Sequence, residues 1–196
     1  MNAQPQPLAY LWWLISRASG IVALVLVALS VAMGLAMAAK VPTRPGAKRR
    51  MVKLHEHVAL TALLAIASHG ASLLGDHWLK PGLSGITVPF AIAYRPQFTG
   101  IGIIAGYVVA LLGPSFYLRR RIGARRWRRF HRLIALAWLL SAVHALGAGS
   151  DAHKLWLRAF VFVPAVPIAY LFVLRLLRGS STPTRAPATS AVALPR

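Results

Sequence analysis

Five long apolar segments, almost free of charged side chains, constrain the fold of this chain more than any other feature. They cover residues 9–39, 54–75, 98–118, 130–149 and 155–178. A helix needs about 20 predominantly apolar residues to cross the hydrocarbon core of a bilayer. Composition agrees, because only 13% of the 196 residues are charged, about half the share of a soluble domain. The sequence therefore predicts an all-α membrane protein, a bundle of about five transmembrane helices.

Basic residues are distributed unevenly among the segments that connect these spans. The chain has 23 Lys and Arg residues against 3 Asp and Glu, a net charge of +20. Of the 23, 18 fall in residues 40–53, in residues 119–132 and beyond residue 174, which five crossings place on one side of the membrane. Because Lys and Arg are retained on the cytoplasmic side, we expect the N-terminus outside and the C-terminus in the cytoplasm.

More than half of the positions in the segment 119–132 are arginines. In a soluble protein this density would suggest nucleic acid. Between two membrane spans it indicates instead a cytoplasmic loop in contact with anionic membrane lipid. We therefore expect membrane lipid, and no nucleic acid, as a partner.

The remaining segments complete the predicted domain organisation. Residues 1–8 form an N-terminal tail, residues 9–178 a single transmembrane domain, and residues 179–196, rich in Ser, Thr, Pro and Ala, a disordered cytoplasmic tail. Residues 82–94 are weakly apolar but too short to span, so we expect an interfacial or re-entrant cover at the outer face. Three glycines in the third span are expected to permit close helix packing: Gly100, Gly102 and Gly106.

Histidine is the candidate metal ligand of this chain. The sequence has no cysteine, which excludes disulfides, thiolate metal sites and iron–sulfur clusters. His55 and His69 lie in the second span, and His131 and His144 in the fourth. Because an ionisable residue inside a span is costly, it points to function. The other three are expected at the surface: His57, His77 and His153.

The four histidines form two pairs that match in depth. The separations are 14 residues on the second span and 13 on the fourth, and both helices are expected to run in the same direction, with the levels about 20 Å apart. Each facing pair could hold a flat metal macrocycle from both sides, as in a six-coordinate b-type haem. At about 100° per residue, 14 residues return to within about 40° of the starting face, but 13 return only to within about 140°. Two explanations are open. The fourth helix begins or is distorted at His131, or the geometry of an ideal helix does not apply there.

Several runs resemble one known family. They are His55-Glu56-His57-Val58-Ala59-Leu60, Ser68-His69, the arginine-rich runs 119–123 and 127–131, and Val143-His144-Ala145-Leu146. Together they are similar to the ferric reductase-like transmembrane domain, found in ferric reductases, NADPH oxidases and the haem-binding membrane subunit of a methionine sulfoxide reductase system. The resemblance covers about residues 10–178, and the family shows the same unequal spacing of histidines on its two ligand helices.

The resemblance implies two haem b groups with bis-His ligation. His55 and His131 would ligate the iron on the cytoplasmic side, and His69 and His144 the iron on the outer side. Arg17, in the outer part of the first span, has two interpretations. It either extends to the lipid headgroups or pairs with a haem propionate, since guanidinium matches carboxylate bidentately. No catalytic side chain is expected.

Larger members of the family carry a cytosolic flavin and nicotinamide domain, but no dinucleotide-binding glycine fingerprint follows the last span here. We therefore expect a ferric reductase-like oxidoreductase component in a bacterial cytoplasmic membrane. A separate cytoplasmic flavoprotein would hold the flavin and donate single electrons. An outer-face acceptor protein or a ferric chelate would receive them. Two alternatives stay open: a haem-binding subunit that serves a separate oxidoreductase, and a small non-haem transporter or assembly protein with structural or proton-relay histidines.

Overall fold

The computed structural model describes residues 10–180 and contains helices but no strand in that range. The predicted N-terminal tail and residues 181–196 of the predicted C-terminal tail lie outside the described residues. The long helices are α1 (Leu11–Ala38), α2 (Ala47–Ser72), α4 (Pro96–Leu112), α7 (Ile134–Ala148) and α8 (Leu155–Ser180). The short elements are α3 (Gly82–Thr87), α5 (Arg119–Ile122), α6 (Ala124–His131) and the 3₁₀ turns η2 (Leu73–Gly75) and η3 (Pro114–Phe116).

Within residues 10–180, five helical segments are long and apolar enough to cross a membrane, which confirms the predicted fold class. The fourth of them, Ala124–Ala148, joins α6 to α7. Large apolar side chains such as Leu64, Leu111 and Val166 are each more than 70% exposed. A soluble protein rarely presents so much exposed apolar surface. The chain is therefore a multi-pass membrane protein whose helices contact lipid.

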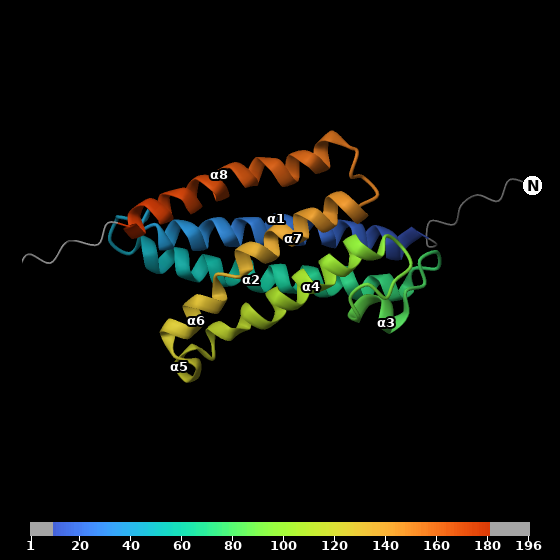
Figure 1. Ribbon diagram of the computed structural model, residues 1–196, viewed down its shortest axis with the longest axis horizontal. Coiled ribbons are helices and arrows are strands. Elements are labelled where there is room, and N and C mark those ends of the chain that lie inside the picture. Colours follow the sequence, from blue (N-terminus) through green and yellow to red (C-terminus); the bar gives the residue numbers. More distant parts are fainter. Residues whose placement is uncertain (1–9, 181–196) are drawn as a thin grey trace, which may run out of the picture.

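Helix α1 is the central element of the bundle. Figure 1 shows it between α2 and α8, with α7 crossing close by, and it packs against all three. Half of the buried apolar core comes from α1, and the rest from α2, α7 and α8. Several core positions are alanines, including Ala28, Ala62 and Ala142, and small side chains let helix backbones approach closely in lipid. These small side chains therefore allow α1 to pack closely against α2.

The short elements lie at opposite ends of the bundle. Figure 1 shows α3 near the beginning of α1, and α5 and α6 at the other end. The basic connection between α1 and α2 lies at the same end as α5 and α6, because α1 ends and α2 begins there. The two arginine- and lysine-rich segments are thus brought to one end, as the charge pattern requires. Which side of the membrane this end faces stays a prediction.

The basic segment 119–132 is helical rather than a loop, which corrects the sequence-based interpretation. Arginine and alanine are good helix formers, and Gly123, with a φ of 89°, separates α5 from α6. A turn at Arg132 and Leu133 then separates α6 from α7.

In that turn the Leu133 N–H donates to the Phe130 carbonyl (2.9 Å), and the Ala135 N–H donates to the Arg132 carbonyl (3.2 Å). Hydrogen bonds over three residues wind the chain more tightly than an α-helix does. The helix is therefore distorted directly after His131, which is one of the alternatives that the unequal histidine spacing left open.

Candidate functional site

The structure brings the four predicted histidines together as two facing pairs. We call His69 of α2 and His144 of α7 the outer pair, and His55 of α2 and His131 of α6 the inner pair, after their predicted positions. The ring centroids are 6.1 Å apart in the outer pair and 6.2 Å apart in the inner pair. The ring planes are nearly perpendicular, at 76° and 80°. Both pairs therefore have almost the same geometry, although they lie at different depths.

Both rings of the outer pair are held through Nδ1 by backbone carbonyls. His69 Nδ1 lies 2.8 Å from the carbonyl oxygen of Ser16 on α1, and His144 Nδ1 lies 2.9 Å from that of Phe98 on α4. A carbonyl can only accept a hydrogen bond, so Nδ1 carries the proton in each ring. Nε2 then carries the lone pair, which is the tautomer that binds a metal.

The inner pair uses the same ring nitrogen but with longer contacts. His131 Nδ1 lies 3.4 Å from the carbonyl oxygen of Leu112, near the end of α4, and His55 Nδ1 lies 3.3 Å from the hydroxyl of Ser30 on α1. Helix α1 therefore supports the histidines of α2, and α4 supports those of α6 and α7. In all four rings the described hydrogen bonds involve Nδ1 and leave Nε2 available.

The spacing of each pair fits a single metal ion between the two rings. Metal–imidazole bonds are about 2 Å long, and a ring nitrogen lies about 1 Å from its centroid, so two rings on one metal have centroids about 6 Å apart. Among residues 10–180 no three His, Cys, Asp or Glu side chains are grouped as metal ligands. A tetrahedral protein site would need more ligands. Two imidazoles at this spacing are compatible with a metal whose remaining ligands come from a planar macrocycle such as haem.

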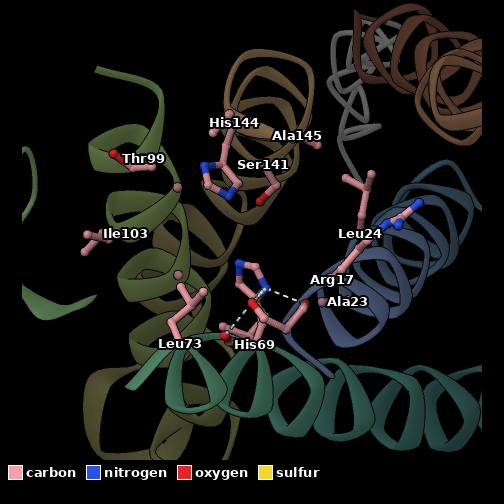
Figure 2. A pocket seen from close by; sticks show the side chains of 18 of the residues that line it. Arg17, Ala23, Leu24, His69, Leu73, Thr99, Ile103, Ser141, His144 and Ala145 are labelled. Carbon is pink, nitrogen blue, oxygen red and sulfur yellow. Dashed lines mark hydrogen bonds between the residues drawn. The ribbon is translucent and has the colours of Figure 1, made fainter. Parts of the chain in front are cut away.

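A cavity of about 620 Å³ surrounds the outer pair. Figure 2 shows His69 and His144 facing each other across it, with Leu73 and Ile103 on one side and Leu24 and Ser141 on the other. Its lining is mostly apolar, as is usual for cofactor pockets, and its volume falls within their range of about 300–1,000 Å³. Segment 82–94 supplies Gly85, Ile86 and Ile92 to the lining. This segment therefore covers the α3 end of the cavity.

Arg17 lines the same cavity but is paired with a carboxylate of this chain. Its guanidinium Nη2 lies 2.5 Å from Asp151 Oδ2. The guanidinium also lies 5.0 Å from the ring centroid of Trp13 and 5.8 Å from that of Trp156. Such cation–π contacts favour a cation that is partly removed from water. Arg17 is therefore a fixed group at the α3 end of the cavity, and no described contact joins it to a histidine.

The inner pair is flanked by an aromatic cluster. Trp127 of α6 stacks on His131 with ring centroids 4.8 Å apart, and its Nε1–H donates to the Ser115 hydroxyl (3.2 Å). The hydroxyl of Tyr117, which directly follows the membrane-length helical segment Pro96–Phe116, donates to the carboxylate of Glu56 at 2.6 Å. This bond raises the pKa of Tyr117, because deprotonation would place two negative groups together. The cluster thus links α6 and η3 to the beginning of α2 around the inner pair.

The three histidines that were not expected in the site lie apart from both pairs. All three are exposed, and none lines the cavity. His57 is one turn from Lys53 on α2, and its Nδ1 lies 2.7 Å from that carbonyl oxygen. Two neighbouring histidines on one helix therefore have different environments: His55 faces another ring and His57 does not.

Sequence reasoning missed a repeated motif on α1. Ser16 and Gly20 contact His69, whereas Ser30 and Gly34 lie against His55. The interval between the two Ser-x-x-x-Gly units of α1 equals the interval between the two histidines of α2. Because α1 and α2 are antiparallel neighbours, each unit meets one histidine. This shared spacing was the signal that could have identified these residues.

Gly102 was expected to allow close packing of helices, but its contact is with a histidine. A Cβ atom at Gly102 would lie within 3 Å of three atoms of the His144 ring. A Cβ atom at Gly106, one turn along α4, would be 3.8 Å from Ile66 Cγ2, which is an ordinary contact. Gly102 therefore provides space for the His144 ring, a role that the sequence alone did not reveal.

Comparison with known proteins matches one family model to residues 19–142, described as the ferric reductase-like transmembrane component. The matched segment includes His55, His69 and His131 and ends just before His144. No curated protein and no solved structure matches the chain. The match covers more than half of the 196 residues and all of α1, α2 and α4 from residue 19 onward. The chain therefore belongs to the family of ferric reductase-like transmembrane components.

Proposed function

We propose that this protein is a di-haem b-type cytochrome that carries single electrons across a membrane. The observation that carries the proposal is the pair of facing imidazoles at each of two levels, with centroids 6.1 and 6.2 Å apart and Nδ1 hydrogen-bonded in every ring. On α2 the two levels are separated by about 21 Å along the helix axis, from the rise per residue of an α-helix. Two redox centres at this separation would divide the hydrocarbon core into shorter electron-transfer steps.

Within this proposal the chain positions the cofactors and tunes them. Haem supplies one-electron chemistry when it is bound. The α2, α6 and α7 histidines would be its axial ligands, while α1 and α4 fix the tautomer and orientation of the rings. With haem in place, the mostly apolar lining around the outer pair would lower the local dielectric constant. Because histidines would hold each haem from both sides, the site favours outer-sphere electron transfer over binding of a substrate to iron.

Arg17 is the proposed partner of an outer haem propionate. It already holds a carboxylate, that of Asp151, at the α3 end of the cavity. A guanidinium can bind a second carboxylate through its remaining N–H groups. A propionate at this end would therefore find a cation whose orientation is already fixed by two tryptophan rings.

The direction of electron flow follows from the predicted orientation. The end that carries α5 and α6 would face the cytoplasm, because Lys and Arg are concentrated there. Exposed arginines on α6, such as Arg125 and Arg128, would attract an acidic flavoprotein donor. Trp127, on the same helix as these arginines, stacks on His131. Electrons would leave at the α3 end to an acceptor protein or a ferric chelate outside a bacterial cytoplasmic membrane.

Electron transfer across vesicle membranes tests this function. We expect vesicles that contain the purified holoprotein and entrapped ferricyanide to bleach when dithionite is added outside, with valinomycin and potassium present to prevent charge build-up. With haem bound at both pairs, single electrons from dithionite outside would reduce ferricyanide to ferrocyanide inside, one electron for each ferricyanide ion. Either orientation of the protein would conduct, so random insertion does not affect the result.

The matched control is the His144→Ala variant in the same vesicles, which should bleach ferricyanide no faster than empty vesicles. A variant of the exposed histidine, His57→Ala, should conduct like the unmodified protein. If unmodified protein with two bound haems bleached entrapped ferricyanide only as fast as empty vesicles, the proposed transmembrane electron transfer would be wrong.

A further inference from the structure

The two serines of the α1 motif offer different atoms to the two histidines. Ser16 approaches His69 through both its carbonyl oxygen (2.8 Å from Nδ1) and its hydroxyl (3.1 Å from Nδ1). The same hydroxyl donates to the backbone carbonyl of His69 at 3.1 Å. The carbonyl is the shorter contact and does not depend on the serine side chain. Removing the Ser16 hydroxyl would therefore leave the Nδ1–H bond of His69 in place.

Ser30 supports His55 by its side chain alone. Its hydroxyl oxygen lies 3.3 Å from His55 Nδ1, and this is the hydrogen bond described for that ring. Ser30 is only 6% exposed, so no water replaces a lost hydroxyl easily. With Nε2 on a metal, Nδ1 carries the proton, and the Nδ1–H donates a hydrogen bond to the hydroxyl oxygen of Ser30. The hydrogen bond of the His55 Nδ1–H therefore depends on a single side-chain atom, the hydroxyl oxygen of Ser30.

The neighbouring glycines strengthen this difference between the two sites. A Cβ atom at Gly20 would lie 2.8 Å from His69 Nδ1, so the helix backbone is packed tightly against that ring. A Cβ atom at Gly34 would lie 3.7 Å from His55 Cε1, an ordinary van der Waals distance. The His69 ring is confined by packing as well as by its hydrogen bond. The His55 ring has more space, so its orientation depends more on Ser30.

We propose that Ser30 is a positioning residue that orients His55 and sets the redox potential of the inner haem, whereas the outer haem depends less on the Ser16 side chain, because the Ser16 carbonyl also holds His69. This inference rests on the proposed function, since it requires haem at both pairs. A hydrogen bond from Nδ1–H makes an imidazole a stronger electron donor, and hydrogen bonding behind a ligand tunes the metal that it binds. A stronger donor stabilises ferric iron. Loss of the Ser30 hydroxyl therefore makes the inner haem easier to reduce.

Potentiometric titration of the haem absorbance tests the proposal. In Ser30→Ala, the ferrous-to-ferric ratio of one haem at a fixed potential should rise by up to about tenfold, a shift of about +59 mV or less for one electron. The other haem should be unchanged. Ser30→Thr, which keeps a hydroxyl at this position, should restore the original potential. Ser16→Ala should shift the potential of the outer haem by less than Ser30→Ala shifts that of the inner haem. Thr61→Ala, at an exposed hydroxyl on α2, should leave both potentials unchanged.

The His144→Ala background identifies which haem has shifted, because it should retain the inner haem alone. There, Ser30→Ala should displace the single titration wave to higher potential. If Ser30→Ala fails to retain the inner haem, its recovery in Ser30→Thr supports the positioning role, and failure of both variants overturns it. Equal shifts from Ser16→Ala and Ser30→Ala, or no shift from Ser30→Ala, also overturn it. Absence of haem from the unmodified protein would instead contradict the proposed function.

Discussion

Replacing His144 with alanine is expected to lower the haem content of the purified protein from two per chain to one. His144 and His69 face each other with ring centroids 6.1 Å apart, and alanine offers no ligand for the iron that they would share. The inner pair lies at another depth and keeps both of its rings. His69→Ala should give the same result, because either ligand of the outer pair is needed.

The measurement is haem per polypeptide, from the pyridine haemochrome absorbance and the protein concentration. His57→Ala is the matched control, since His57 is an exposed histidine on the same helix as His69, and it should retain two haems. The spectrum of the single haem left in His144→Ala should remain low-spin. If both His69→Ala and His144→Ala retained two low-spin haems per chain, the assignment of these ligands would be wrong.

A single methyl group at Gly102 is expected to have nearly as large an effect. A Cβ atom there would approach Nδ1 of His144 most closely and would lie 2.6 Å from Cγ and 2.7 Å from Cε1 of the same ring. Real Cβ atoms do not approach other atoms so closely, so the ring would have to move. Moving it breaks the Nδ1–H bond to the Phe98 carbonyl and displaces Nε2 from His69. Gly102→Ala should therefore lose the outer haem, and overpacking should lower the stability by about 1–3 kcal/mol.

Gly106→Ala is the control for helix propensity and for packing on α4. Its added methyl group would meet Ile66 Cγ2 at 3.8 Å, so this variant should keep two haems. Haem content and thermal unfolding of the two variants, measured side by side, separate an effect on the ring from a general effect on the helix. The account of Gly102 fails if Gly102→Ala binds two haems and has the spectrum of the unmodified protein.

The fold could be predicted from the sequence because the bilayer demands long apolar helices. Five such segments were visible in the sequence, and the described part of the chain contains five helical segments of suitable length and hydropathy. The basic segment 119–132 was interpreted as a loop because its charges obscured its helix-forming residues. The segment forms two helices because Gly123, which has a positive φ, separates α5 from α6. A hydropathy pattern does not reveal such a local backbone conformation. The charge pattern placed the segment between two spans, whereas the fourth membrane-length helical segment, Ala124–Ala148, includes α6. Charge therefore indicated neither the secondary structure of the segment nor where that helical segment begins.

The pairing of the histidines could also be anticipated, since two parallel helices with similar spacings bring equivalent positions to the same depth. What the sequence did not reveal was the support behind each ring. The contact of Ser16 with His69, and that of Leu112 with His131, depend on the antiparallel register between neighbouring helices. Arg17 was expected either to extend to headgroups or to bind a propionate, and its partner Asp151 lies far along the chain, after α7. Such contacts become visible only when the helices are placed in space.

The two sites differ in a way that bears on the direction of electron flow. The Nδ1 contacts of the outer pair, at 2.8 and 2.9 Å, are shorter than those of the inner pair, at 3.3 and 3.4 Å. Stronger hydrogen bonds behind the ligands favour ferric iron, so on this basis the outer haem is expected to have the lower potential. An outer acceptor must then remove electrons continuously for flow to proceed outward.

The absorption spectrum of the detergent-purified protein, recorded oxidised and after reduction with dithionite, tests the central claim most directly. The protein should be expressed with an adequate supply of haem, and the haem content should be measured on the same sample. The account predicts a low-spin, six-coordinate b-type spectrum with two haems per chain. A protein that folds in the membrane but shows no haem absorbance, or only a high-spin spectrum, would contradict it.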